Sequence, residues 1–237
     1  MNSPGSEDLE LIEREVKATL AAPRADTLQF LSDVIRRLRA IPVRTDLPRR
    51  INCLLDIASL YYLQGQSSFS AVEPSALAVM LARDTADKAL LRKALTIQGV
   101  VLQATNNPGY AIAALSEALE ICEELDDSQA KVVVWNNLCL AFYEAALYGE
   151  ARDCWERAVQ LAAGSASLRP FRVVAIANVA LSCLHMGEYA DGLERIRDSI
   201  GLTAAPANAA DMLHRVTADG TYTRLLLALG RIPEAAE

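Results

Sequence analysis

The chain has 237 residues, a formal net charge of -7, and 52% hydrophobic but only 5% aromatic residues. This length allows one large domain or two small ones with a substantial core, and the abundance of alanine and leucine is typical of closely packed helices. The acidic balance, without a basic stripe, argues against nucleic-acid binding, and no apolar run of about eighteen residues is available to span a membrane.

Two amphipathic helices are predicted near the start of the chain, over residues 8–21 and 27–40, separated by Ala22-Pro23-Arg24. We expect residues 1–49 to cap a repeat array that occupies residues 50–237. Such a cap is needed because the first repeat of a helical array otherwise exposes an apolar edge to water.

A pattern of small and large residues recurs along the array about every forty residues. Its clearest copy, residues 132–163, has large residues at Trp135 and Trp155 and small ones at Ala151 and Ala158. The small residue that opens the second helix of each repeat recurs at intervals of 40, 40, 41 and 43 residues, at Ala71, Ala111, Ala151, Gly192 and Ala235. This register predicts stacked antiparallel helix pairs, in which small residues sit where two helices touch. It also predicts that Trp135 and Trp155 are largely buried between the helices of one repeat.

The copy at residues 132–163 resembles the tetratricopeptide repeat (TPR). The matching residues are Trp135, Leu138, Tyr148, Ala151, Trp155 and Ala158, with Cys139 in place of the usual glycine. The resemblance implies an all-α fold, a right-handed α-solenoid of antiparallel helix pairs. The long period resembles that of bacterial regulators of the maltose-activator kind and of quorum-peptide sensors. Most of the chain, including residues 60–95, is similar in general character to N-terminal sensor regions of proteobacterial proteins that end in a cyclic-di-GMP synthase (GGDEF) or hydrolase domain, and this resemblance assigns no catalytic residue.

The chain ends at Glu237, two residues after the last small position of the pattern. We therefore expect about 4.5 repeats, truncated at the C-terminus, with an exposed apolar patch at that end. Association with a second copy of the chain, as a homodimer, would cover such a patch.

Catalytic and metal-binding patterns are not found. The two histidines, His185 and His214, lack the Ser, Cys or Asp neighbours of a triad or metal site, and there is no glycine-rich phosphate loop. Cysteines occur within apolar helical patterns and away from histidine, at Cys53, Cys122, Cys139, Cys154 and Cys183. We expect them to be small core residues in a cytoplasmic protein, and we expect no enzyme activity, cofactor or metal.

A binding groove is the alternative that the repeat pattern favours. The resemblance implies that the first helices of the repeats line a concave groove for a protein or peptide. The candidate groove residues are Thr96, Gln103, Asn136, Asn137, Leu140, Tyr143, Glu144, Asn178, Leu181 and His185. Asn137 and Asn178 are equivalent, and a side-chain amide can bond both the N–H and the C=O of an extended peptide. The alternative, that these amides hold neighbouring helices together, remains open.

The leading hypothesis is a protein- or peptide-binding input module of a cytoplasmic bacterial signalling protein, acting through a C-terminal output domain such as a diguanylate cyclase. One alternative is a free-standing scaffold or self-association module without an output domain. A second alternative is the regulatory region of a transcription activator. The output domain that follows Glu237, where there is one, distinguishes the three.

Overall fold

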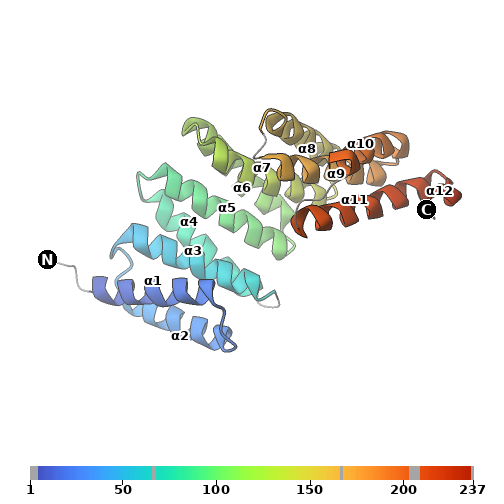
Figure 1. The fold of residues 1–237 in the computed structure, drawn as a ribbon. Helices are drawn as coiled ribbons and strands as arrows, with labels where there is room; N and C mark the ends of the chain where they lie inside the picture. Colours follow the sequence, from blue (N-terminus) through green and yellow to red (C-terminus); the bar gives the residue numbers. More distant parts are fainter. Residues whose placement is uncertain (1–4, 66–67, 166–167, 203–208, 236–237) are drawn as a thin grey trace. The chain divides into compact units, whose positions relative to one another are not determined.

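The computed structural model describes residues 5–65, 68–165, 168–202 and 209–235, and every regular element in these ranges is helical (Figure 1). The elements are α1 (Ser6–Ala21), α2 (Thr27–Ala40), α3 (Leu47–Leu63), the short 3-10 helix η1 (Ser68–Ala71), α4 (Val72–Arg83), α5 (Lys88–Ala104), α6 (Pro108–Glu124), α7 (Ser128–Glu144), α8 (Tyr148–Ala162), α9 (Arg169–Met186), α10 (Tyr189–Leu202), α11 (Ala209–Ala228) and α12 (Ile232–Ala235). The predicted all-α fold is confirmed for the described part of the chain.

The turns between paired helices repeat the predicted spacing. A residue with positive φ ends the first helix of four successive pairs, at Asn106 (58°), Ala146 (58°), Gly187 (79°) and Gly230 (71°). In each turn the next N–H donates to the carbonyl five residues earlier, from Asn107 to Leu102 (2.8 Å), Leu147 to Phe142 (3.0 Å), Glu188 to Cys183 (2.9 Å) and Arg231 to Leu226 (2.9 Å). This is the Schellman arrangement, which satisfies the last carbonyls of a helix and reverses the chain. The turns thus recur at the same interval of about forty residues as the small residues of the repeat pattern.

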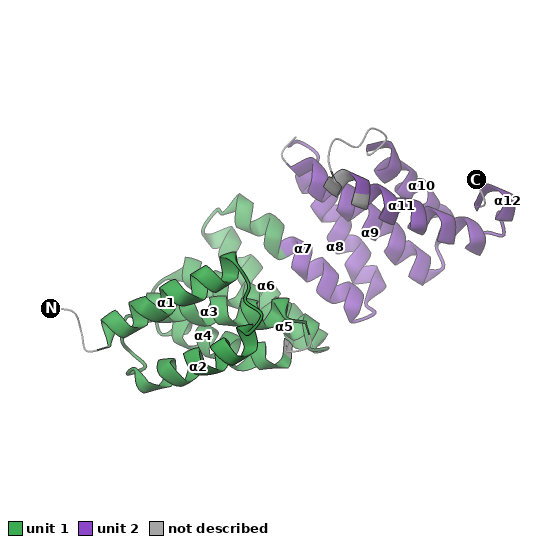
Figure 2. Ribbon diagram, turned by 60° about the horizontal axis from the view of Figure 1, so that its bottom comes forward, with its two compact units in different colours: residues 1–134 green, residues 135–237 purple. Residues whose placement is uncertain are grey.

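The chain forms two compact units, residues 1–134 and 135–237, with the boundary inside α7 (Figure 2). In the first unit, α1 and α2 share one buried cluster with α3, in which Ile12, Leu31 and Ile57 are fully buried. This packing supports a capping role for α1 and α2, which remains a prediction.

Small residues allow α5 and α6 to approach closely within the first unit. A Cβ atom added at Gly99 would lie 2.5 Å from Cγ of Leu115, which is too close for any side chain. Ala111, at the predicted contact position of α6, is fully buried. The repeat pattern thus places small residues where these two helices meet.

The second unit follows the same rule. A Cβ atom at Gly192 would lie 3.1 Å from the carbonyl oxygen of Ala180 and 3.0 Å from Cδ2 of Leu225, so α10 is held close to α9 and α11. Trp155 is 1% exposed, as expected. Trp135, which was expected to be largely buried, is only half-buried.

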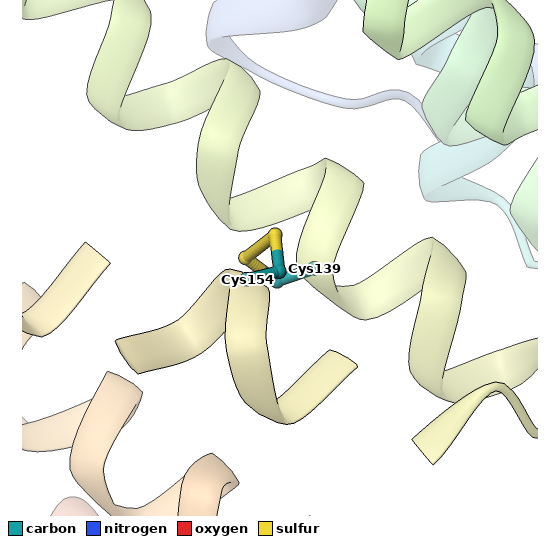
Figure 3. Close-up of a disulfide and its surroundings, with 2 residues drawn as sticks. All are labelled: Cys139 and Cys154. Atoms are coloured by element: carbon teal, nitrogen blue, oxygen red, sulfur yellow. A yellow bond between two sulfur atoms is a disulfide. The ribbon is translucent and has the colours of Figure 1, made fainter. Parts of the chain in front are cut away.

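All five cysteines are buried, as expected. The structure adds a pairing that was not expected, because Cys139 of α7 and Cys154 of α8 form a disulfide, with their Cα atoms 5.3 Å apart (Figure 3). The other three cysteines, Cys53, Cys122 and Cys183, are free thiols. Cys139 stands where the TPR pattern has glycine, so its side chain points at the neighbouring helix.

Apolar side chains are exposed near the last described helix. Leu227 is 52% and Ile232 is 64% exposed, in agreement with the expected apolar surface at this end. Glu237 lies outside the described residues, and association with a second copy remains a prediction. None of the described helices is long and apolar enough to cross a membrane.

Candidate functional site

Helix α9 carries one stripe of candidate residues. Asn178, Leu181 and His185 are spaced i, i+3 and i+7, which places them along one helix face. Asn178 and Leu181 are half-buried and His185 is exposed. The helix ends at Gly187, whose left-handed conformation (φ 79°) stops it directly after this stripe.

Helix α7 carries a matching stripe. It begins after Asp127, whose side chain accepts a 2.9 Å hydrogen bond from the N–H of Ala130 and so caps the helix. Asn137, Leu140 and Glu144 follow each other at the same i, i+3 and i+7 spacing, and Leu140 and Glu144 are exposed. The two stripes therefore present the same residue order: an asparagine, a leucine and a polar end.

An aromatic cluster joins the ends of the two stripes. The Tyr143 hydroxyl and His185 Nε2 share a 2.8 Å hydrogen bond. Tyr148, the first residue of α8, stacks on the His185 ring with a centroid distance of 4.6 Å, and Tyr143 meets both rings edge-on. Residues 143 and 185 were both predicted to be groove positions, and the structure brings them together.

The charge environment keeps the Tyr143 phenol neutral. Burial raises its pKa, the neighbouring Tyr148 raises it further, and the positive charge of Arg224 on α11 lowers it in part. A neutral phenol can both donate and accept a hydrogen bond. The cluster thus offers a polar atom within an aromatic surface.

The two equivalent asparagines differ in their partners. The Asn136 amide donates to Oδ1 of Asn137 at 3.5 Å, a weak bond, and Asn137 has a further interaction. For the Asn178 side chain the described residues provide no hydrogen-bond partner; only its backbone carbonyl is used, by the Ser182 hydroxyl at 2.9 Å. The Asn137 amide is therefore engaged within the protein, whereas that of Asn178 has no such partner among the described residues.

Thr96 and Gln103 do not join this cluster. Both lie on α5 in the first compact unit and are half-buried. The Thr96 hydroxyl donates to the carbonyl of Arg92 at 2.8 Å, and Gln103 also has a partner. Their role in a groove remains a prediction.

The α7–α9 face presents amide, leucine, phenol and imidazole side chains. Within the described ranges, no group of three or more His, Cys, Asp or Glu side chains is placed to hold a metal ion. The hydrogen-bond partner of His185 is a phenol, which lacks the carboxylate that orients a catalytic imidazole. His214, on α11, has a buried Nδ1 without a hydrogen-bond partner among the described residues.

Comparisons with known proteins support the fold directly. No protein-family model matches the sequence, and no curated protein matches it significantly. A kinesin light chain-like protein with TPR-like repeats from Podospora anserina superposes with a TM-score of 0.68 and 19% identity, over 80% of this chain and 91% of that one. The chain has the TPR-like helical-repeat fold.

Two further solved proteins share this TPR-like fold. A Rap protein solved in complex with competence and sporulation factor gives a TM-score of 0.69 at 12% identity, over 100% of this chain and 64% of that one. A signal-transduction ATPase with a TPR sensor from Pyrococcus horikoshii gives 0.72 at 13% identity, over 97% of this chain and 36% of that one. This chain thus spans less than two thirds of the length of either protein.

Three features were not predicted from the sequence. Tyr148 was assigned to the repeat framework, and its stacking on His185 depends on a contact between residues 37 apart that no local pattern encodes. The turn between α7 and α8 brings Cys139 and Cys154 together. Their separation of 15 residues, which spans one antiparallel helix pair, could have indicated the bond. The third feature, a cavity beside Arg50, is described below.

Proposed function

We propose that the α7–α9 face binds an extended segment of a peptide or protein. The observation that carries this proposal is the Asn178 side chain, a half-buried amide without a hydrogen-bond partner among the described residues. One acceptor and two donors allow it to pair with both the N–H and the C=O of a peptide backbone. Such a contact recognises an extended chain independently of its sequence.

The two stripes also carry apolar side chains. Leu181 follows it on the same face of α9, and Leu140, which is 36% exposed, lies on the corresponding stripe of α7. The Tyr143–His185–Tyr148 rings close the end of the stripes. Aromatic and leucine side chains around a few polar groups are the usual composition of a peptide-binding surface.

The shared fold agrees with this assignment. TPR-like repeats are typically interaction modules and not catalytic ones, and a Rap protein of the same fold was solved in complex with competence and sporulation factor. A ligand that lies along successive first helices would use the stripes described above.

Peptide selection followed by matched variants tests the proposal. Random peptides displayed on phage would be selected on the full chain, and the affinities of enriched peptides would be measured by fluorescence anisotropy. We expect Asn178→Ala to weaken binding by about 1–3 kcal/mol, the cost of a covered polar group left unpaired. Gln160→Ala, an exposed amide on α8, is the matched control and should leave the affinity unchanged.

Stability separates the two roles of the amide. If Asn178 contacts a ligand, Asn178→Ala should change the melting temperature no more than Gln160→Ala does. If the variant melts lower and binds selected peptides as well as the wild type, the amide is structural and the proposal is wrong. Failure to enrich any peptide would also contradict it.

We further propose that the module is the input region of a bacterial signalling protein with a C-terminal output domain such as GGDEF. The resemblance of residues 60–95 and the TPR sensor of the signal-transduction ATPase support this. Sequencing the coding region downstream of Glu237 tests it. A cyclase or hydrolase domain there supports the proposal, a DNA-binding domain favours a transcription activator, and a stop codon favours a free-standing scaffold.

A further inference from the structure

A small cavity lies in the first compact unit, where α2, α3 and α4 meet. Its volume is about 150 Å³. Its apolar lining is Ile35, Leu38, Ile41, Leu54, Pro74 and Leu77. The floor is buried, since Leu38, Ile41 and Leu54 are each at most 5% exposed, whereas Val43 at the rim is 54% exposed. The cavity is thus a pocket with an apolar floor and a solvent-exposed mouth.

A buried arginine also lines this pocket. Arg50 of α3 is 4% exposed. Its guanidinium donates to the carbonyls of Leu38 (3.2 Å), Ile41 (3.0 Å) and Pro42 (2.9 Å), at the end of α2 and just beyond it. A cation at this place caps the helix and complements its dipole. These bonds fix the guanidinium at the wall of the pocket.

The charge of Arg50 is not neutralised by the residues around it. Its Nε–H is shielded from solvent and has no acceptor, and within the described ranges no carboxylate forms an ion pair with it. The other charged groups lining the pocket, Arg39 and Glu73, pair with each other at 2.8 Å. The pocket therefore has a net charge of one positive unit in a chain of net charge -7.

Burying a cation without an anion costs free energy. Burial accordingly lowers the pKa of Arg50, and Cys53 opposes this shift in part. A bound anion would offset this cost.

We propose that this pocket binds a small monocarboxylate with a compact apolar body, with the carboxylate against Arg50 and the body on Leu38, Leu54 and Leu77. An apolar cavity of about 150 Å³ accommodates a benzene-sized group, so benzoate is a suitable probe. A dianionic phosphate fits less well, because it would exceed the single positive charge, approach Glu73 and leave the apolar wall without contact.

Calorimetric titration of the full chain with benzoate tests the proposal. Benzyl alcohol, which is similar in size but uncharged, is the control ligand. We expect saturable binding of benzoate, about tenfold or more tighter than that of the alcohol, because hydrogen bonds to charged groups are stronger than neutral ones. Leu77→Trp, which fills the pocket from α4, should abolish binding. Leu161→Trp, on the exposed surface of α8, should leave it unchanged.

A second variant addresses the charge. Arg50→Met removes the cation and keeps much of the side-chain volume, and it should reduce the affinity for benzoate to that for benzyl alcohol. Circular dichroism would check that the variant remains helical; if it unfolds, Leu77→Trp and the alcohol decide the question. Equal affinities for benzoate and benzyl alcohol, undiminished binding by Leu77→Trp, or no saturable binding of benzoate would each overturn the proposal.

Discussion

Gly99 and Gly220 are both inside helices, yet replacing each by alanine should change the stability of the protein in opposite directions. At Gly99 of α5, a new Cβ atom would lie 2.5 Å from Cγ and 2.8 Å from Cδ2 of Leu115. Leu115 is fully buried, so it has no free space in which to move. At Gly220 of α11, the new Cβ atom would meet nothing within 4 Å apart from its chain neighbours and the backbone of its own helix.

The magnitudes follow from two opposing effects. Alanine favours a helix over glycine by about 1 kcal/mol, and overpacking a filled core costs about 1–3 kcal/mol. We therefore expect Gly99→Ala to lower the free energy of unfolding by about 1 kcal/mol, and by at most about 2. Gly220→Ala should raise it by about 0.5–1 kcal/mol, because only the helix preference changes.

Urea unfolding followed by circular dichroism at 222 nm, the standard helical signal, measures both free energies of unfolding. Thermal melting checks the direction, since about 1 kcal/mol shifts the midpoint of a chain of this size by about 2–4 °C. If Gly99→Ala stabilises the protein as Gly220→Ala does, α5 and α6 do not meet at Gly99, and the assigned repeat contact is wrong.

Further predictions concern the turns and the cysteines. Ala146→Gly should stabilise by about 0.5–1 kcal/mol and Gly187→Ala destabilise by about 1–2 kcal/mol in urea unfolding, because both residues have positive φ; equal effects of one sign would contradict the turn assignment. Reduction of the Cys139–Cys154 bond, whose cysteines are 15 residues apart, should lower stability by about 3 kcal/mol, and a double alanine variant should not respond to reductant. Burial raises the pKa of the Cys53 thiol to about 12, whereas the unfolded thiol ionises near pH 8.5, roughly. The stability that the neutral thiol contributes is therefore fully present below about pH 8.5 and is lost as the pH rises toward the pKa of the folded state. The free energy of unfolding should consequently differ less between pH 7 and pH 10 for Cys53→Ala than for the wild type.

The repeat architecture could be predicted because it depends on local patterns. Small residues at Ala111 and Ala151, and turns ending at Asn106 and Gly187, recur at nearly constant intervals, and each requires only a few neighbouring residues. Their positions in the structure agree with the pattern. Ala146 shows the limit of residue preference, since alanine occupies a left-handed turn position that favours glycine or asparagine.

The features that were not predicted depend on contacts between distant residues. The stacking of Tyr148 on His185 requires that two repeats superpose and that both side chains adopt particular rotamers. No local sequence pattern shows that the Arg50 guanidinium is buried, because its position depends on contacts with the carbonyls at the end of α2. Trp135 is half-buried although its repeat position predicted burial. The position of a residue in the repeat thus predicts which helix face it lies on, but not what fraction of its side chain is buried.

Photo-crosslinking tests most directly the claim that the face formed by the first helices of the second unit binds an extended segment. A benzophenone side chain would replace either Leu181, on the proposed face of α9, or Leu161, on the exposed surface of α8, and each variant would be irradiated with a selected peptide. We predict a crosslinked product from position 181, suppressed by unlabelled peptide, and none from position 161. Crosslinking from position 161, or none from position 181, would contradict the account.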